Sequence, residues 1–568
     1  MKRREFLQRM GAVAPAAMVG RATPAAAGTA GTSAGASGEP RVFMYDDGRH
    51  SAPLYQFAPP LTAEDYLLTV DLLAQTGVDT LVSMVGLEGG VALYDSHVCQ
   101  KWGDNMKTWG HPIFYRAARG LKQLIDDGHD PLQLLCDRCH ELGLWFIAAN
   151  WLSIQSGRRD DSSAGHGRKS DFSYDHPEYH VGPDSDPRAK TIDPQRFSLL
   201  YDEVREERFR VFEEILDRYP VDGVEVNLLE MMPGCKFDQS ARLAPLLTEW
   251  FRRLRKAAEL AQEKQNRRKR IYVRIPVYPE AWTALGFDVA TWVREGLVDG
   301  LICVAGMMEA PSDQNVDFAG VRFLTRGTDC KVIFGFSDII YRQLERATTP
   351  EMIWAAAANG YDRGADGFAI VEYHFTPNGW PWQDEDFATL RLLQRPDLLR
   401  RADKHYRVRS ARRGRDTSEW VPGAHTPLPR ELVEGKPFTA SFYVSDDVEA
   451  AHAEGRLESA NLRVRVTNVE PSLNDLRVEF NGRELPDTIL DLNDVTYRLY
   501  ELGAFGPYGF IYEFRLPPDQ LPRRGLNTVT VTLVKKDPLL DNSLSVYDID
   551  CPVKYREHRH FREIPFDY

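Results

Sequence analysis

Apolar and polar positions follow two alternating periods between residues 41 and 395. Short apolar runs of strand length are separated by longer stretches whose apolar residues recur at helical spacing. The expected strands cover residues 41–47, 79–86, 144–152, 223–230, 270–277, 300–306, 331–338 and 367–375. Strands that alternate with helices form parallel sheets. Eight such units in about 350 residues predict an α/β fold of the TIM-barrel type, a (β/α)8 barrel over residues 41–398.

The helices between these strands are predicted from amphipathic stretches. They cover residues 62–77, 112–128, 130–143, 206–220, 242–264, 287–296, 317–327 and 350–364. A doubly wound parallel sheet is the alternative arrangement of the same elements. It is disfavoured because no Gly-x-Gly-x-x-Gly segment opens a helix.

The pattern changes after about residue 400. A basic connector, residues 399–424, is followed by short alternating segments typical of antiparallel strands, such as PFTASFYV and NTVTVTLVK. The dipeptide Asn481-Gly482 is a turn signal between two of them. Residues 425–568 are therefore expected to form an antiparallel β-sandwich. Because the connector is charged rather than rich in Gly, Ser or Pro, we expect the sandwich to support the barrel.

Residues 1–27 have the layout of an export signal, with a basic start, a short apolar middle and small residues at the end. The segment RREFL (residues 3–7) resembles the twin-arginine signal, although Lys2 and Gln8 depart from its usual flanking residues. The apolar part is shorter than the roughly 20 residues that a membrane span needs. Residues 28–40 are expected to be a flexible linker, and the mature chain, with no integral membrane span, is expected in the periplasm or outside the cell.

Composition narrows the classes of partner. The formal net charge is −13, which disfavours a nucleic-acid partner and docking on anionic membranes. Hydrophobic residues make up 43% of the chain, enough for a large core. The seven cysteines are odd in number and irregularly spaced, so they do not predict a disulfide scaffold.

Polar residues stand inside one expected strand, VDGVEVNLLE at residues 221–230. Glu225 and Asn227 are two apart and therefore point to the same face, and Glu230 follows at the strand end. Burying an unpaired carboxylate is costly, so that face has to offer a partner or a function. Glu225 either forms a structural ion pair with Arg274 on the next strand or takes part in catalysis.

Barrel enzymes place their chemistry at the C-terminal ends of the strands. Two carboxyl groups are what hydrolysis of a glycosidic bond requires, and aromatic rings offer flat apolar platforms for sugars. The carboxyl candidates at these ends are Glu225, Glu230 and Glu372. The residues expected to bind the substrate are Asp46, Asn150, Trp151, Asn227, Arg274, Tyr278, Glu309, Asp338, His374 and Trp380. A single acid at a strand end can equally be a loop or helix cap, which is the alternative for Asp46, Glu309 and Asp338.

The fourth strand resembles that of glycosidase-like barrels, including family-10-type glycosyl-hydrolase-like bacterial proteins and, more distantly, the chitinase-like family-18 barrels. In the family-18 pattern DGxDxDxE, Asp222 and Gly223 match, whereas Glu225 and Asn227 stand for the two inner aspartates. The final acid falls one position late, at Glu230. The large clan with a nucleophile on strand seven is not matched, because FGFSD contains no Glu. The resemblance covers one strand and the general βα order, and it implies a barrel that hydrolyses glycosidic bonds.

Two motifs offer other chemistry. CDRCH at residues 136–140 fits the pattern of covalent haem attachment, but its cysteines have the spacing of a buried helix face. A metal-assisted hydrolase could use loop histidines 166, 176 and 180 together with His374. The first strand, however, has no His-x-His pair of the kind that metal-dependent barrels usually carry. We therefore expect no cofactor and no metal site.

These patterns together predict an exported glycoside hydrolase with a carbohydrate substrate. A barrel that binds glycans without cleaving them and a metal-assisted hydrolase are the alternatives.

The export signal generates a prediction. Changing Arg3-Arg4 to Lys-Lys should abolish export, because the twin-arginine route depends on that pair, and the exported chain should begin near Gly28. Fractionation of cells and N-terminal sequencing measure both points. Export that continues unchanged in the double variant would exclude the twin-arginine route.

Overall fold

The computed structural model describes residues 38–48, 54, 55, 57, 59–229, 232–305, 313–337, 348–371, 384–410, 421–493 and 509–556. The predicted export signal and most of the predicted linker lie outside these residues. No helix among the described residues is both long and apolar enough to cross a membrane.

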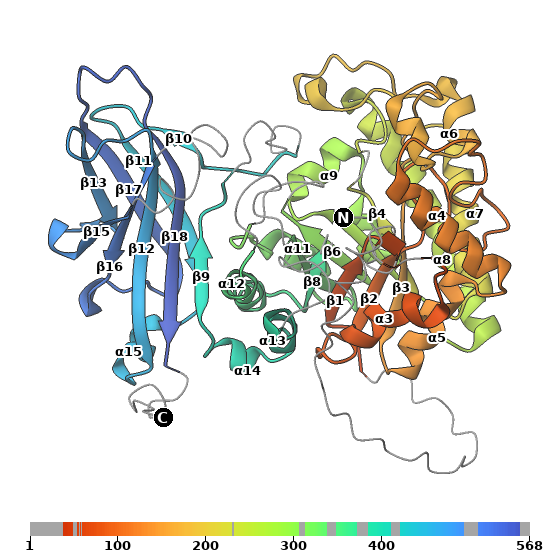
Figure 1. Ribbon diagram of the computed structural model, residues 1–568, viewed down its shortest axis with the longest axis horizontal. Coiled ribbons are helices and arrows are strands. Elements are labelled where there is room, and N and C mark those ends of the chain that lie inside the picture. Colours follow the sequence, from red (N-terminus) through yellow and green to blue (C-terminus); the bar gives the residue numbers. More distant parts are fainter. Residues whose placement is uncertain are drawn as a thin grey trace, which may run out of the picture. The chain divides into compact units, whose positions relative to one another are not determined.

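Eight parallel strands close into a barrel, which confirms the predicted fold (Figure 1). Each strand pairs with the next along the chain, and the eighth pairs with the first. Every predicted strand is present, and where its ends are described they differ from the predicted ones by at most a few residues. The strands are β1 (Val42–Asp46), β2 (Thr80–Met84), β3 (Trp145–Trp151), β4 (Gly223–Asn227), β5 (Arg270–Pro276), β6 (Gly300–Val304), β7 (Lys331–Ser337) and β8 (Gly367–Val371).

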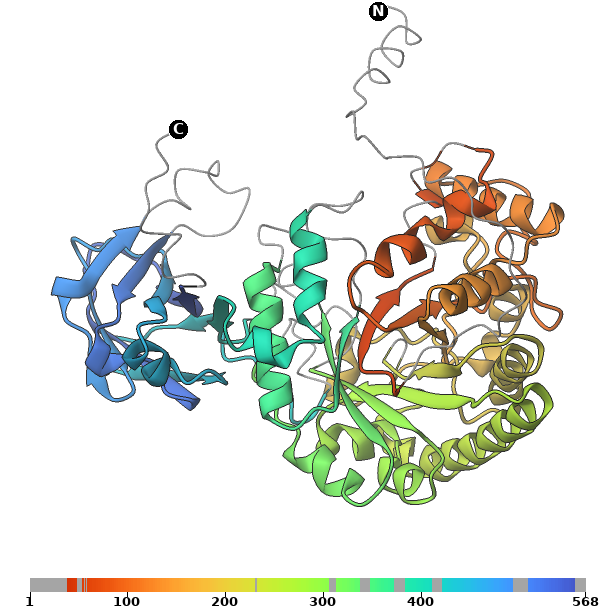
Figure 2. The ribbon, with the colours of Figure 1, turned by 90° about the horizontal axis from the view of Figure 1, so that it is seen from below.

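Helices cover the outside of the barrel (Figure 2). The longer ones are α3 (Ala63–Leu73), α4 (Pro112–Asp126), α5 (Pro131–Glu141), α7 (Asp202–Arg218), α8 (Ser240–Gln265) and α12 (Pro350–Asp362). The shorter ones are α6 (Asp171–Asp175), α9 (Pro279–Leu285), α10 (Val289–Arg294), α11 (Ala319–Thr325), α13 (Asp384–Leu392) and α14 (Pro396–Leu399). Local signals set their starts: α5 begins with Pro131 after Asp130, whose carboxylate accepts the Leu132 N–H. Most buried residues of the longer helices belong to the same hydrophobic core as the barrel strands.

A buried polar cluster closes the N-terminal end of the barrel beneath β4. Asp222 accepts hydrogen bonds from the Phe146 N–H at 2.9 Å and from Arg267 at 2.8 Å, and it also contacts His140 at 2.9 Å. These contacts hold the pKa of Asp222 below its usual value although burial acts in the opposite direction. The aspartate of the Asp-Gly pair before β4 is therefore a structural residue on the face opposite the barrel mouth.

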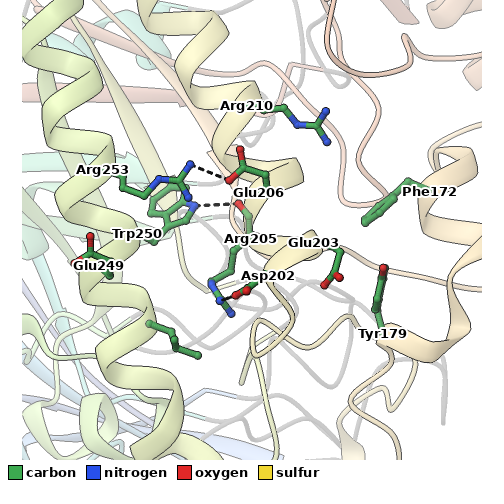
Figure 3. Close-up of a pocket in the computed structure, with 11 residues that line it drawn as sticks. Phe172, Tyr179, Asp202, Glu203, Arg205, Glu206, Arg210, Glu249, Trp250 and Arg253 are labelled. Atoms are coloured by element: carbon green, nitrogen blue, oxygen red, sulfur yellow. Dashed lines mark hydrogen bonds and ion pairs between the residues drawn. The ribbon is translucent and has the colours of Figure 1, made fainter.

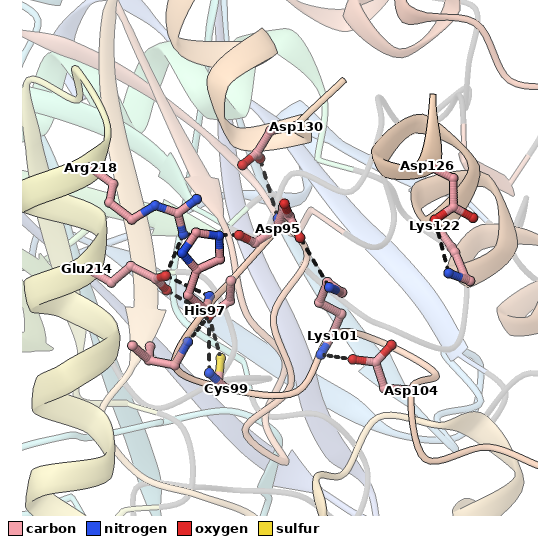
Figure 4. A network of polar contacts seen from close by, with 12 residues as sticks. Asp95, His97, Cys99, Lys101, Asp104, Lys122, Asp126, Asp130, Glu214 and Arg218 are labelled. Atoms are coloured by element: carbon pink, nitrogen blue, oxygen red, sulfur yellow. Dashed lines mark hydrogen bonds and ion pairs between the residues drawn. The ribbon is translucent and has the colours of Figure 1, made fainter. Parts of the chain in front are cut away.

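The long loop after β2 is fixed to α7 by one carboxylate, Glu214 (Figure 4). Glu214 accepts hydrogen bonds from Tyr94 OH at 2.9 Å, Ser96 Oγ at 2.7 Å and the His97 N–H at 2.7 Å, and it pairs with Arg218. Four contacts satisfy a buried carboxylate, so this part of the loop is well anchored.

The C-terminal region folds as two antiparallel sheets, as predicted. One has the order β10-β18-β12-β16-β15 with β9 also paired to β18, and the other has the order β11-β17-β13-β14. Asn481 and Gly482 both have positive φ, as the predicted two-residue turn between β13 and β14 requires. The strands are β9 (Lys404–Arg407), β10 (Arg430–Glu431), β11 (Pro437–Val444), β12 (Leu457–Thr467), β13 (Asp475–Phe480), β14 (Arg483–Glu484), β15 (Leu490–Asn493), β16 (Gly509–Arg515), β17 (Gly525–Lys535) and β18 (Ser545–Tyr555); α15 (Val448–Ala453) follows β11.

Barrel helix α12 makes buried polar contacts with strand β11. Asn359 of α12 donates to the Tyr443 carbonyl at 2.9 Å and accepts from the Ser445 N–H at 3.1 Å. Its side chain also donates to the Gln314 carbonyl at 3.0 Å, and the residue is fully buried. Ala355 of the same helix belongs to the hydrophobic core of the sandwich.

These contacts predict that the barrel depends on the sandwich. Asn359→Ala should lower the free energy of unfolding by about 2 kcal/mol or more, because it leaves buried backbone groups without partners. Denaturant titration measures the change, with the exposed Glu263→Ala in α8 as the control. A fragment of residues 41–398 should be unstable for the same reason; a soluble fragment that melts at the temperature of the full chain would contradict the prediction.

Candidate functional site

The barrel interior can be assigned from one ring contact. Phe43 of β1 and Tyr272 of β5 have ring centroids 5.3 Å apart. These strands are not neighbours in the closed barrel, so the two rings meet inside it. In the register, Glu225 lies beside Tyr272. Glu225 therefore faces the interior, as the sequence predicted for the face that it shares with Asn227.

Glu225 forms the ion pair with Arg274 that was one of the two expectations for it. Arg274 Nη2 lies 2.8 Å from Glu225 Oε1 and 3.0 Å from Oε2. The two side chains are 3% and 0% exposed, respectively. The Arg274 guanidinium also lies over the ring of Tyr45, 4.2 Å from its centroid. The pair thus joins β4 to β5 and reaches across the interior to β1.

The electrostatics of this pair are set by opposing effects. Burial raises the pKa of Glu225 above its usual value, and the guanidinium of Arg274 counteracts the shift. Removing either partner would leave an uncompensated buried charge, at a cost of about 3–5 kcal/mol. The pair is therefore a structural element of the barrel, whatever chemistry it serves.

Trp151 and Asn227 lie beside each other at the C-terminal ends of β3 and β4, and Arg274 lies beside Asn227 on β5. The Asn227 Oδ1 accepts the Leu229 N–H at 2.9 Å, which leaves its NH2 group to donate elsewhere. Trp151 is buried, and its Nε1 has no acceptor among the described residues. The structure thus brings three of the predicted binding residues into one interior row of hydrogen-bond donors.

Asp46 and Asn150 occupy the opposite face of their strands, because each alternates with an inward-facing neighbour, Tyr45 and Trp151. The Asp46 Oδ1 accepts the Gly48 N–H at 3.0 Å, and burial raises the pKa of Asp46 to about 6. The Asn150 Oδ1 accepts the Trp151 N–H at 2.8 Å. Both side chains shape the ends of their strands from outside the interior.

Tyr278 lies two residues beyond β5 and is half-buried. Its hydroxyl accepts a hydrogen bond from Arg409 Nη1 at 3.3 Å, and burial raises the pKa of the phenol. Arg409 was not among the predicted site residues. Six predicted residues, Glu230, Glu309, Asp338, Glu372, His374 and Trp380, lie outside the described residues.

A second missed contact joins the loops after β2 and β3. Glu88, which is buried, pairs with Arg168 Nη1 at 2.6 Å. The Arg168 guanidinium lies 5.5 Å from the centroid of the Phe114 ring. Glu88 followed a strand in the sequence pattern, but nothing in that pattern indicated a partner 80 positions away.

The structure also shows the surroundings of the two motifs that offered other chemistry, the CDRCH segment and the loop histidines. Cys136 and Cys139 are buried on α5, as their spacing predicted, and burial raises the pKa of both thiols. His176 contacts Glu178 at 2.7 Å, and His180 contacts Ser156 at 2.8 Å. Among the described residues, no group of three or more His, Cys, Asp or Glu side chains could hold a metal ion.

A groove of about 770 Å³ on the outside of the barrel is lined by residues of α7 and α8 and by Phe172 and Tyr179 (Figure 3). Its charged side chains largely pair with one another: Arg253 contacts Glu206 at 2.8 Å, and Arg205 pairs with Asp202. The Trp250 indole donates to the Arg205 carbonyl. These internal pairs leave few groups for a ligand, so the barrel mouth is the stronger candidate for the site.

Comparison with known proteins gives similarity of shape without similarity of sequence. No protein-family model and no curated protein matches the chain. The solved structures that it is similar to include the PgaB glycoside hydrolase domain from Bordetella bronchiseptica, with a TM-score of 0.40 and 11% identity over 62% of this chain and 98% of that one. A bacterial fucosidase has a TM-score of 0.35 and 11% identity over 88% of this chain and 98% of that one. The maltogenic α-amylase AmyB from Thermotoga neapolitana has a TM-score of 0.34 and 10% identity over 87% and 99%. At these values the comparisons assign no activity to this chain.

The raised pKa of Asp46 predicts a pH dependence of stability. The folded chain holds this proton more tightly than the unfolded chain, so ionisation of Asp46 lowers the free energy of unfolding as the pH rises from about 4 to about 6. Asp46→Asn removes that loss and keeps an acceptor for the Gly48 N–H. Relative to the wild type, the free energy of unfolding of the variant should therefore rise by up to about 3 kcal/mol across this pH range.

Urea unfolding at a series of pH values measures the effect. Asp137→Asn, on the exposed side of α5, serves as the control. Parallel stability curves for wild type and Asp46→Asn would contradict the assigned pKa.

Proposed function

We propose that the chain is a glycoside hydrolase whose site is the C-terminal mouth of the barrel. The observation that supports this most directly is the interior row of Trp151, Asn227 and Arg274 at the ends of β3, β4 and β5. The row offers an indole N–H, an amide and a guanidinium above an inward-facing carboxyl group. Sugar hydroxyls need such donors, and the indole also provides an apolar platform.

The roles follow from the chemistry of each group. Trp151 and Asn227 would donate hydrogen bonds to sugar hydroxyls, and Tyr278 at the rim would pack against a sugar ring. Glu225 would be one of the two carboxyl groups that hydrolysis requires. Its raised pKa is the direction that a general acid needs, and Arg274 would hold it in one orientation. Glu230 and Glu372 are the proposed sources of the second carboxyl group.

A barrel that binds glycans without cleaving them is the second candidate. The observation that favours it is the Glu225–Arg274 ion pair, which accounts for the buried carboxylate without any catalytic role. In that case the donors of the mouth would recognise a sugar and no bond would break.

The proposed setting is the periplasm or the cell exterior, reached by the twin-arginine pathway. The support for this is the RREFL segment and the short apolar stretch behind it.

Glu225→Gln distinguishes the two candidates. If Glu225 is catalytic, turnover should fall at least about 10²-fold in a folded variant, since general acid–base catalysis contributes about 10²–10⁴. If it is only structural, activity should fall no further than the folded fraction does. Turnover on a panel of glycans, with and without chelator, and the melting temperature are measured on the same protein.

Glu214→Gln is the matched control, because Glu214 is also a buried carboxylate paired with an arginine, but on the outer layer of the barrel. It should lose stability without a specific loss of turnover. Normal turnover in well-folded Glu225→Gln would remove this residue from the mechanism, and loss of all activity with chelator would favour a metal-assisted reaction.

A further inference from the structure

Arg409 reaches the rim of the barrel from the segment that follows β9. Its Nη1 donates to the Ala305 carbonyl at 3.1 Å and to the Tyr278 hydroxyl at 3.3 Å. Ala305 directly follows β6, and Tyr278 lies just beyond β5. The guanidinium therefore lies at the C-terminal ends of these two neighbouring strands.

The same register relates Arg409 to the proposed site. Arg274 of β5 lies beside Ile302 of β6. Ala305 is three residues further along, which at about 3.3 Å per residue is about 10 Å closer to the rim. Arg409 and Arg274 thus both lie at strands β5 and β6, with the contacts of Arg409 nearer to the rim.

One edge of the Arg409 guanidinium has no partner. The residue is 2% exposed, and its Nε and Nη2 are buried without an acceptor among the described residues. These two N–H groups form the fork that binds a carboxylate or a sulfate through two parallel hydrogen bonds. The Asp313 carboxylate lies close enough to raise the pKa of the Tyr278 phenol, although no ion pair joins it to Arg409 among the described residues.

Other buried arginines of the described chain are satisfied differently. The buried Arg270 and the half-buried Arg255 and Arg465 each have one nitrogen without a hydrogen-bond partner among the described residues, but each also pairs with a carboxylate, of Glu39, Asp299 and Asp548, respectively. Arg196 has no carboxylate partner, but its nitrogens donate to the carbonyls of Asp193, Pro233 and Cys235. Arg409 differs in that a whole edge of its guanidinium, Nε and Nη2, has no hydrogen-bond partner among the described residues.

We propose that Arg409 binds the anionic group of an acidic sugar, so that the preferred ligand of the mouth is a glycan carrying a carboxylate or a sulfate. This rests on the proposed function for its carbohydrate class, and the neighbouring Tyr278 ring offers the sugar an apolar face. The chain carries a formal net charge of −13, so its overall field repels such a ligand. The Nε and Nη2 groups of Arg409 would select the anionic ligand locally, against this overall repulsion.

The test measures binding rather than turnover, on the full mature chain. Glucuronate, glucose 6-sulfate and glucose are titrated into the wild type, Arg409→Lys, Arg409→Gln and Arg407→Lys. Arg407 is the control because it lies two residues away and pairs with Asp548 at 3.5 Å. The wild type should bind at least one acidic sugar about tenfold or more tightly than glucose.

Both Arg409 variants should lose most of that preference, because lysine keeps the charge but not the fork, whereas Arg407→Lys should retain it. Circular dichroism confirms that each variant is folded. The proposal is overturned if the wild type shows no preference, if neither acidic sugar binds at millimolar concentration, or if folded Arg409 variants keep the preference.

The outcome is separable from that of the proposed function. An acidic-sugar preference that depends on Arg409, in a chain that cleaves no glycan, would sustain this assignment and overturn hydrolysis. Cleavage of neutral glycans that Arg409→Lys leaves unchanged, with no preference in binding, would do the reverse. Whether glucuronate or glucose 6-sulfate binds more tightly decides between the carboxylate and the sulfate.

Discussion

A carboxylate inside a closed barrel has to be neutralised within the barrel. Glu225 has no access to solvent, and the nearest cation is Arg274 on the adjacent strand. The cation in turn lies over the ring of Tyr45, so three strands take part in the arrangement. The residues that line the mouth, Trp151 and Asn227, occupy the next positions of the same register, and their orientation follows from that packing.

Two kinds of buried polar group are exemplified at the two ends of the barrel. At the N-terminal end, Asp222 is held by a histidine, an arginine and a backbone N–H, and every contact is internal. At the C-terminal end, Trp151 and Arg409 carry buried donors that the described residues do not satisfy. Stability accounts for the first kind of group, whereas unsatisfied buried donors are a departure that native proteins tolerate mainly at functional sites.

The eight barrel strands were predictable because a parallel strand that is covered on both faces reads as a continuous apolar run. Strand β18 was not predicted, although Tyr547, Ile549, Cys551 and Val553 alternate with Asp548, Asp550 and Pro552; a proline inside a segment argues against a strand. In the folded chain these acids contact Arg465 and His405 on the neighbouring strands β12 and β9, a compensation that is invisible before the strands are paired. Helix α9 was missed because its seven residues, about two turns, are too few to show a clear period.

The candidate site was predictable only in part. The pair of Glu225 and Arg274 could be anticipated, because consecutive strands of a barrel are neighbours. Arg409 could not, since it is one of several arginines in a basic stretch and contacts a tyrosine 131 positions earlier. Long-range contacts of this kind depend on how the connector returns to the barrel, and no local pattern carries that information.

The ring of Tyr272 inside the barrel has an evolutionary consequence. A Cβ atom on Gly300 of β6 would lie only 2.7 Å from this ring. The tyrosine ring therefore occupies the space that a side chain at position 300 would need. The two positions share one volume. Among homologous chains, a larger residue at the position of Gly300 should occur together with a smaller one at the position of Tyr272, so these two columns of an alignment should covary although they lie on different strands.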